Sequence, residues 1–273
     1  MSLSNVKRFI DLTRTSGLTS FTATLEFIGG STQLMLVVFR KIRTRPFYIQ
    51  LVAEQCYSLG VRSLSIAFIT ALSTGAVMSL QFGYGLERFG GKPYVPRVVG
   101  LSILRELGPV LTCLMLAGRV GSGIAAEIGS MKVTQQVDAI RALGTDPIKR
   151  LVIPRVLAMI LMTPLITAMA DLCGVFGGMF ISTSQLNIHP EFYLNEGLFA
   201  LRTSDFTVGI AKTFFFAIII AFTGCYYGLK TEGGTQGVGL STTHAVVTSS
   251  ILITMSDFVL TKLFWIIESA FNI

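Results

Sequence analysis

The hydrophobic residues of this 273-residue chain gather into long windows separated by short polar segments. A helix needs about 20 apolar residues to cross a bilayer. Five windows reach that length: Ser63–Phe82, Val98–Val120, Leu151–Phe180, Val208–Leu229 and Val246–Ile267. The third is too long for one straight crossing at about 1.5 Å per residue. We therefore expect five membrane helices, the third of which tilts, extends beyond the lipid, or breaks near Pro164 or Gly174.

The segment 21–39 is also apolar, but a glutamate, two glycines and a glutamine interrupt it and a basic cluster follows it directly. Such a pattern is typical of a helix that lies in the membrane interface. We predict an elbow helix within an amino-terminal region of residues 1–55, followed by a permease-like membrane domain of residues 56–273. A sixth membrane span is the alternative interpretation of 21–39.

The run EIGSMKVTQQVDAIRALGTDP at 127–147 is a short amphipathic segment, called the two-faced segment below, in an otherwise hydrophobic chain. Apolar residues recur at helical spacing on one face: Val133, Val137 and Ile140. Polar residues have the same spacing on another face: Thr134, Asp138 and Arg141. Gly144 suits the left-handed residue that ends a helix, and Pro147 prevents its continuation. The pattern predicts a helix of about three turns outside the bilayer.

Composition and charge place the chain in a membrane. It is 51% hydrophobic and 14% charged, against roughly 25% charged residues in soluble domains. With a cytoplasmic amino terminus, the inner segments hold thirteen Lys and Arg residues and the outer loops four. The positive-inside rule therefore puts the two-faced segment in the cytoplasm and the carboxyl terminus outside. The net charge of +7 needs no nucleic acid, since anionic lipid headgroups account for it.

Motifs for enzymatic chemistry are missing. In GLERFGGKP, Leu86 replaces the first glycine of a phosphate-binding loop and Pro93 its hydroxyl residue. The sequence contains no Ser/His/Asp arrangement, paired-carboxylate motif or HExxH motif, which argues against a hydrolase within the bilayer. The four cysteines and two histidines lack ligand spacing. We expect no catalytic site and no metal site.

Arg105 and Glu106 lie near the middle of the second window, where an unpaired charge is costly. Adjacent helical residues point about 100° apart, so these two are poor partners for each other. Pro109 removes the helical hydrogen bond that the Arg105 carbonyl would otherwise accept. Two readings are compatible: the pair lines a polar cavity, or it forms interhelical salt bridges with acids and bases of other windows, namely Asp171, Lys212 or Asp257.

Two GxxxG motifs, Gly174 with Gly178 and Gly224 with Gly228, permit close helix contact. Such contact is possible within one chain or between two copies. The motifs alone leave both possibilities open.

Several segments together resemble a known family: LRELGPV at 104–110, the AGR-to-TDP block at 117–147, PR at 154–155 and DFVLT at 257–261. They are similar to the MlaE-type permeases of bacterial MCE lipid transport systems, which belong to the ABC transporter superfamily. The similarity runs from about residue 45 onward. It implies an all-α fold with an elbow helix and five transmembrane helices, similar to G-type ABC exporters.

The resemblance also implies partners and a location. The permease would be a homodimer in the bacterial inner membrane, and its coupling helix, about 131–143, would dock on a separate ATPase subunit. That subunit would bind ATP and Mg, so the permease itself would be no enzyme and hold no cofactor. A periplasmic MCE-domain protein and a small STAS-domain protein would complete the complex. The transported substrate would be phospholipid.

Site residues follow from the same resemblance. Four residues would face the lipid cavity: Gln81, Tyr84, Arg105 and Glu106. Four would form the coupling helix, with Val137 packed against its own chain and three polar residues facing the ATPase: Thr134, Asp138 and Arg141.

Two other classes of function remain as alternatives. An ion-coupled secondary transporter would use Glu106, Asp171 and Asp257 as a proton relay. A structural membrane anchor of an envelope complex would tolerate neutralisation of Arg105 and Glu106.

Overall fold

The computed structural model describes residues 25–42 and 48–271. The chain divides into two units, Met1–Arg45 and Pro46–Ile273. In the first unit, residues 25–41 form one helix, which covers most of the predicted elbow segment. Residues 21–24 of that segment lie outside the described residues. The interfacial position of this helix, and the boundary at residue 55, stay predictions.

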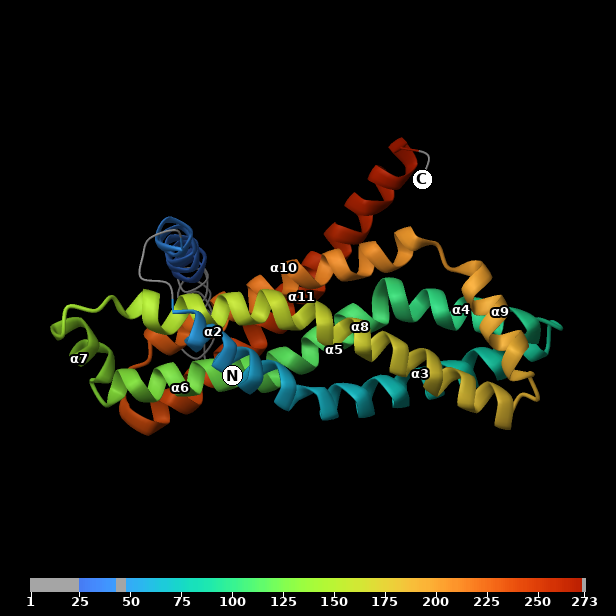
Figure 1. Cartoon of the computed structure of the whole chain (residues 1–273), viewed down its shortest axis with the longest axis horizontal. Coiled ribbons are helices and arrows are strands. Elements are labelled where there is room, and N and C mark those ends of the chain that lie inside the picture. The colour runs from blue at the N-terminus through green and yellow to red at the C-terminus, as the bar shows by residue number, and fades with distance from the viewer. Residues whose placement is uncertain (1–24, 43–47, 272–273) are drawn as a thin grey trace, which may run out of the picture. The chain divides into compact units, whose positions relative to one another are not determined.

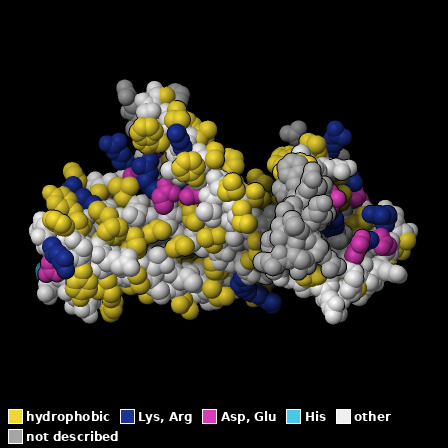
Figure 2. All heavy atoms as spheres, turned by 180° about the vertical axis from the view of Figure 1, so that it is seen from behind, with side chains coloured by type: hydrophobic (Ala, Val, Ile, Leu, Met, Phe, Trp, Pro, Cys, Tyr) yellow, Lys and Arg dark blue, Asp and Glu magenta, His cyan; other side chains and the backbone are white. Residues whose placement is uncertain are grey.

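The second unit is built from helices, and the described residues contain no strand. Five of its helical segments are long and apolar enough to cross a bilayer: Ile49–Glu87, Lys92–Val133, Ile148–Ser184, Thr203–Leu229 and Gly234–Ala270. Each contains one predicted window, so the expected five-helix membrane fold is confirmed. Figure 2 shows hydrophobic side chains over most of the middle of one face, as lipid contact requires.

The individual elements are named as in Figure 1. The first span comprises α2 (Ile49–Gln55), two short irregular helical turns and α3 (Leu64–Glu87). The second comprises α4 (Val95–Ser102), a π-helical turn (Ile103–Leu107), α5 (Gly108–Leu116), a second π-helical turn (Ala117–Gly121) and α6 (Ser122–Val133). The later elements are α7 (Gln136–Ala142), α8 (Ile153–Ser184), α9 (Pro190–Ala200), α10 (Thr203–Leu229) and α11 (Gly234–Phe271). In Figure 1, α7 lies at one end of this unit, and α4 and α9 lie at the other.

The long third window forms one continuous helix. Helix α8 runs through Pro164 and Gly174 without ending at either residue, so the predicted break is wrong. The whole segment Ile148–Ser184 has 37 residues and would measure about 55 Å, against a hydrocarbon layer of about 30 Å. The helix must therefore tilt or extend beyond the lipid, which were the two alternatives to a break.

Helix α8 packs closely against α3 because glycines face each other. A Cβ atom on Gly75 would lie 1.8 Å from the carbonyl oxygen of Gly174. Similarly, a Cβ on Gly228 would lie 2.8 Å from the Cβ of Ile128, where α10 meets α6. Small residues allow such backbone approach between membrane helices. Both GxxxG motifs thus contribute to contacts within one chain.

The two-faced segment differs from its prediction. Val133 is the last residue of α6 rather than part of a separate helix. The chain then turns at Gln135, which has a left-handed φ of 58°, and α7 begins only at Gln136. The prediction of a single helix over 131–143 is therefore wrong. The separate helix, α7, has only about two turns. Its end is as predicted, since Gly144 has a φ of 75°.

Helix α11 has a distinctive position in the second unit. Figure 1 shows its carboxyl-terminal part leaving the other helices and projecting away from them. Only 6% of its apolar window is buried, whereas about half of the windows in α8 and α10 is buried. Helices α8 and α10 therefore form the centre of the unit, and α11 forms part of its outside.

Candidate functional site

The site begins with an irregular turn in the second span. Residues Ile103–Leu107 form a π-helical turn between α4 and α5. Pro109 follows it and has no backbone N–H to donate to the Arg105 carbonyl. The Nζ atom of Lys212 on α10 lies 3.1 Å from that carbonyl oxygen and donates to it instead. The free carbonyl expected from the sequence is thus satisfied by a side chain from another helix.

Lys212 is the centre of a polar network. It has no exposed surface, so its charge requires partners. Its Nζ lies 2.7 Å from Glu106 Oε2 and 3.1 Å from Asp257 Oδ1 on α11. It also lies 2.7 Å from the hydroxyl of Thr261. The predicted salt bridge between Glu106 and Lys212 is confirmed, and Asp257 joins through the same lysine.

Arg105 makes a second set of ion pairs on the other side of the turn. Its Nε lies 3.3 Å from Asp205 Oδ1, in the first turn of α10. Its Nη2 lies 2.5 Å from Glu268 Oε2, near the end of α11. Arg105 and Glu106 are not paired with each other, as expected. Sequence reasoning missed both acids because it searched only the middle of the spans.

Asp171 does not take part, although it was a predicted partner. Its side chain is buried on α8, and neither carboxylate oxygen has a hydrogen-bond partner within the described part of the chain. A Cβ on Gly108 would lie 1.7 Å from Asp171 Oδ1, so this carboxyl packs against the backbone at the start of α5. The proposed pairing of Asp171 with Arg105 or Glu106 is therefore wrong.

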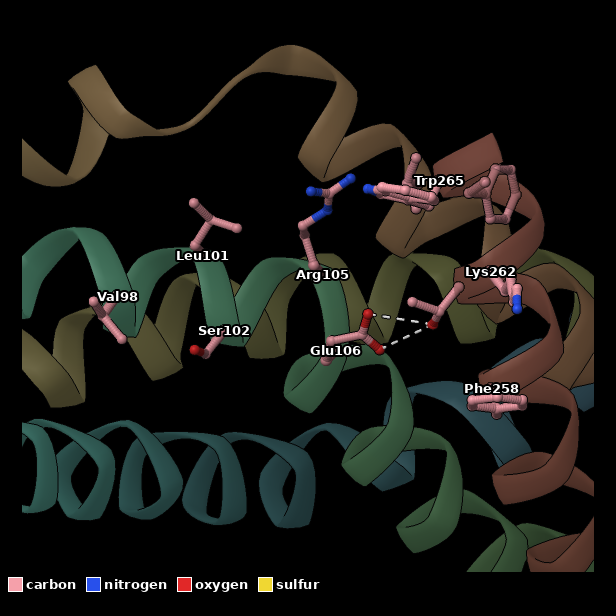
Figure 3. Close-up of a pocket in the computed structure, with 11 residues that line it drawn as sticks. Val98, Leu101, Ser102, Arg105, Glu106, Phe258, Lys262 and Trp265 are labelled. Atoms are coloured by element: carbon pink, nitrogen blue, oxygen red, sulfur yellow. Dashed lines mark hydrogen bonds between the residues drawn. The ribbon is translucent and has the colours of Figure 1, made fainter. Parts of the chain in front are cut away.

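A cavity of about 610 Å³ opens beside the ion pairs (Figure 3), within the range typical of ligand pockets. Its walls come from the second span, α10 and α11. They consist of Val98, Leu101, Ser102, Arg105, Glu106, Val208, Phe258, Thr261, Lys262, Phe264 and Trp265. Figure 3 shows Glu106 directed toward α11, where Thr261 donates to its carboxylate at 3.3 Å. The cavity therefore combines a mostly apolar wall with a few charged groups.

The other two cavity candidates lie elsewhere. Gln81 and Tyr84 are exposed on α3, and neither lines the cavity beside Arg105. The structure of one chain brings together two of the four predicted residues. Whether Gln81 and Tyr84 face a lipid stays a prediction.

Helix α7 presents the two faces that its sequence predicts. Val137 is 2% exposed, so it packs against its own chain. Asp138 and Arg141 on α7 are exposed, and so is Thr134 in the turn before it. Asp138 Oδ2 lies 3.2 Å from Lys132 Nζ, which links α7 to α6. Sequence reasoning missed Leu143, an apolar residue that is 81% exposed directly after α7.

An ion pair between a buried arginine and an exposed glutamate connects α6 to α8. Arg155 is 3% exposed, and its Nη2 lies 2.8 Å from Glu127 Oε2. Its Nη1 also donates to the carbonyl oxygen of Leu151 at 2.7 Å. Because α6 leads directly to the turn before α7, this pair fixes the base of the two-faced segment to the central helix.

Comparison with known proteins assigns this arrangement to a family. The family model "Permease MlaE" matches residues 52–263, most of the second unit and all of the ion-pair residues except Glu268. The chain belongs to the MlaE permease family. It is 41% identical to a probable ABC transporter permease protein of Rickettsia felis over 238 residues, 87% of this chain and 92% of that protein.

Other relatives of this MlaE permease come from photosynthetic organisms. It is 45% identical to a probable ABC transporter permease protein of Synechocystis over 210 residues, 77% of this chain and 80% of the relative. It is 37% identical to the chloroplast protein TRIGALACTOSYLDIACYLGLYCEROL 1 of Arabidopsis thaliana over 212 residues, 78% of this chain and 61% of that protein. The chain is thus a multi-pass membrane permease of the ABC transporter class.

Proposed function

We propose that this MlaE permease moves phospholipids between the bacterial inner membrane and a periplasmic MCE-domain protein. The observation that carries the proposal is the cavity beside Arg105 and Glu106, which has a mostly apolar wall and a small number of charged groups. A phospholipid has the same division between acyl chains and a charged headgroup. The Arabidopsis relative, whose name refers to a glycosylated diacylglycerol, supports a lipid substrate.

The working unit in this proposal is a homodimer. Only 6% of the apolar window of α11 is buried within the chain, and α11 supplies Phe258, Thr261 and Trp265 to the cavity wall. A second copy that packs against the outside of the second and fifth spans would enclose the cavity between the two chains. Enclosure would exclude water from the headgroup site and strengthen its ion pairs.

The energy would come from a separate ATPase subunit that binds ATP and Mg. Helix α7 supports this role because its apolar residue Val137 is buried while Asp138 and Arg141 are exposed. We propose that the ATPase docks on this coupling helix at the cytoplasmic side, with the amino terminus on the same side. A STAS-domain protein would bind the ATPase. Movement of α7 would reach α8 through the Glu127–Arg155 pair.

A reconstitution experiment tests the proposal. The permease is purified with its associated ATPase, placed in liposomes that contain a fluorescent phospholipid, and mixed with the MCE-domain protein. We expect ATP-dependent transfer of the phospholipid, and loss of transfer in Glu106→Gln, which leaves Lys212 with one carboxylate fewer. ATP-independent transfer driven by a pH gradient alone would contradict the proposal and favour an ion-coupled carrier. Undiminished transfer in Glu106→Gln would contradict the role of the cavity.

A further inference from the structure

The ion pairs beside the cavity contain more acidic than basic side chains. Two cations share four carboxylates: Arg105 contacts Asp205 and Glu268, and Lys212 contacts Glu106 and Asp257. Buried charges are stable when they are balanced, and here the carboxylates exceed the cations by two. Glu268 Oε1 is also buried without a hydrogen-bond partner in the described residues. Of these four carboxylates only Glu106 lines the cavity, and 40% of its side chain is exposed.

Lys262 is the cation that stands apart from these pairs. It lines the same cavity, its side chain is exposed, and no ion pair links it to an acid within residues 48–271. It follows Thr261, whose hydroxyl contacts Glu106 at 3.3 Å, so the ammonium of Lys262 on α11 and the carboxylate of Glu106 on the second span line the same cavity (Figure 3). A ligand that carries both charges would balance both groups.

We propose that Lys262 binds the phosphate of a zwitterionic phospholipid, whose headgroup ammonium faces the carboxylate of Glu106. This inference rests on the proposed function and adds the charge type of the substrate. A lysine ammonium is a common phosphate ligand, and a carboxylate with free lone pairs accepts from an ammonium. The apolar residues Phe258 and Trp265 on the same helix contact the acyl chains near the headgroup.

The same charges disfavour an anionic headgroup. Phosphatidylglycerol carries the phosphate but no ammonium, so it would bring its net negative charge beside the carboxylate of Glu106 with no ammonium to balance it. Like charges placed together at a binding surface oppose association. The permease therefore selects phosphatidylethanolamine over phosphatidylglycerol.

Trp265 provides a direct measurement, because it is the only tryptophan in the chain and lines the cavity. The full-length permease in lipid-free detergent micelles is titrated with phosphatidylethanolamine or phosphatidylglycerol whose acyl chains carry bromine, which quenches tryptophan fluorescence on contact. We expect quenching at lower concentrations of phosphatidylethanolamine. Lys262→Gln should weaken its apparent affinity roughly tenfold, since a hydrogen bond between charged groups is lost. Lys262→Arg should retain the affinity.

Lys92→Gln is the matched control. It removes the same charge from a lysine that pairs with Glu87 at 2.8 Å and does not line the cavity, so its quenching curve should equal that of the wild type. Equal curves for the wild type and Lys262→Gln, or equal affinities for the two lipids, would overturn this inference alone. Absence of quenching by either lipid in the wild type would contradict the proposed phospholipid function itself.

Discussion

The ammonium of Lys212 lies 3.1 Å from the main-chain carbonyl oxygen of Arg105, the acceptor that Pro109 leaves without a helical donor. One buried side chain therefore satisfies a broken backbone hydrogen bond and two carboxylates at once. This relationship explains why a proline and adjacent charges are tolerated together within a membrane helix, where each unsatisfied polar group is costly.

Replacing this lysine should destabilise the fold. In Lys212→Met, the carboxylates of Glu106 and Asp257 lose their buried partner, and removing one member of a buried ion pair typically costs about 3–5 kcal/mol. We expect a clearly lower thermal unfolding temperature in detergent. Lys132→Met, which breaks an exposed pair with Asp138, should cost about 1 kcal/mol or less. Equal unfolding temperatures for the two variants would contradict the central role of Lys212.

Two glycines of α3 should respond differently to the same substitution. Gly75→Ala places a methyl group 1.8 Å from the Gly174 carbonyl oxygen if nothing moves, and such overpacking typically costs about 1–3 kcal/mol. Gly85→Ala meets no atom within 4 Å and gains helix propensity. Thermal unfolding of the purified variants should therefore show a loss for Gly75→Ala only. A loss of similar size in both would refute the close packing of α3 on α8.

An acidic residue at the buried face of α7 should separate ATP hydrolysis from transport. Val137→Asp buries an unpaired carboxylate, which a fold does not tolerate without rearrangement, so α7 should leave its position. We expect the ATPase to dissociate, or to hydrolyse ATP without lipid transfer. Gln185→Asp introduces a carboxylate at an exposed position outside α7 and is the control. Normal ATPase assembly together with full lipid transfer in Val137→Asp would exclude the coupling role.

Topology can be measured with two residues of equal exposure. Leu143, directly after α7, and Phe199, in α9, are both 81% exposed. In a variant without the native cysteines, Leu143→Cys should resist a membrane-impermeant thiol reagent in intact spheroplasts, while Phe199→Cys should react. The reverse pattern would place α7 outside the cell and invalidate both the orientation and the ATPase docking.

The sequence predicted the membrane helices well because the bilayer restricts what a chain can do. A window such as Val208–Leu229 has one stable arrangement in lipid, and α10 follows it closely. The interruptions were harder to predict. The π-helical turn at Ile103–Leu107 and the left-handed Gln135 depend on contacts and turns that periodicity does not encode.

The site was predictable only where a physical requirement was local. A charge such as Glu106 in mid-membrane needs a partner, and Lys212 was one of few available. The pairing of Arg105 with Glu268 depends instead on how α11 crosses the second span, which no sequence pattern specifies. Asp171 is also a charged residue within a membrane helix, yet it joins no ion pair in the described residues, because its carboxyl packs against the backbone at Gly108.

The contact between Arg105 and Glu268 also affects how the protein is handled in the laboratory. Glu268 lies in the last turn of α11. A truncation after residue 267 would remove one of the two acids that hold Arg105. A shortened version of the protein for structural or transport work should therefore keep α11 through Phe271.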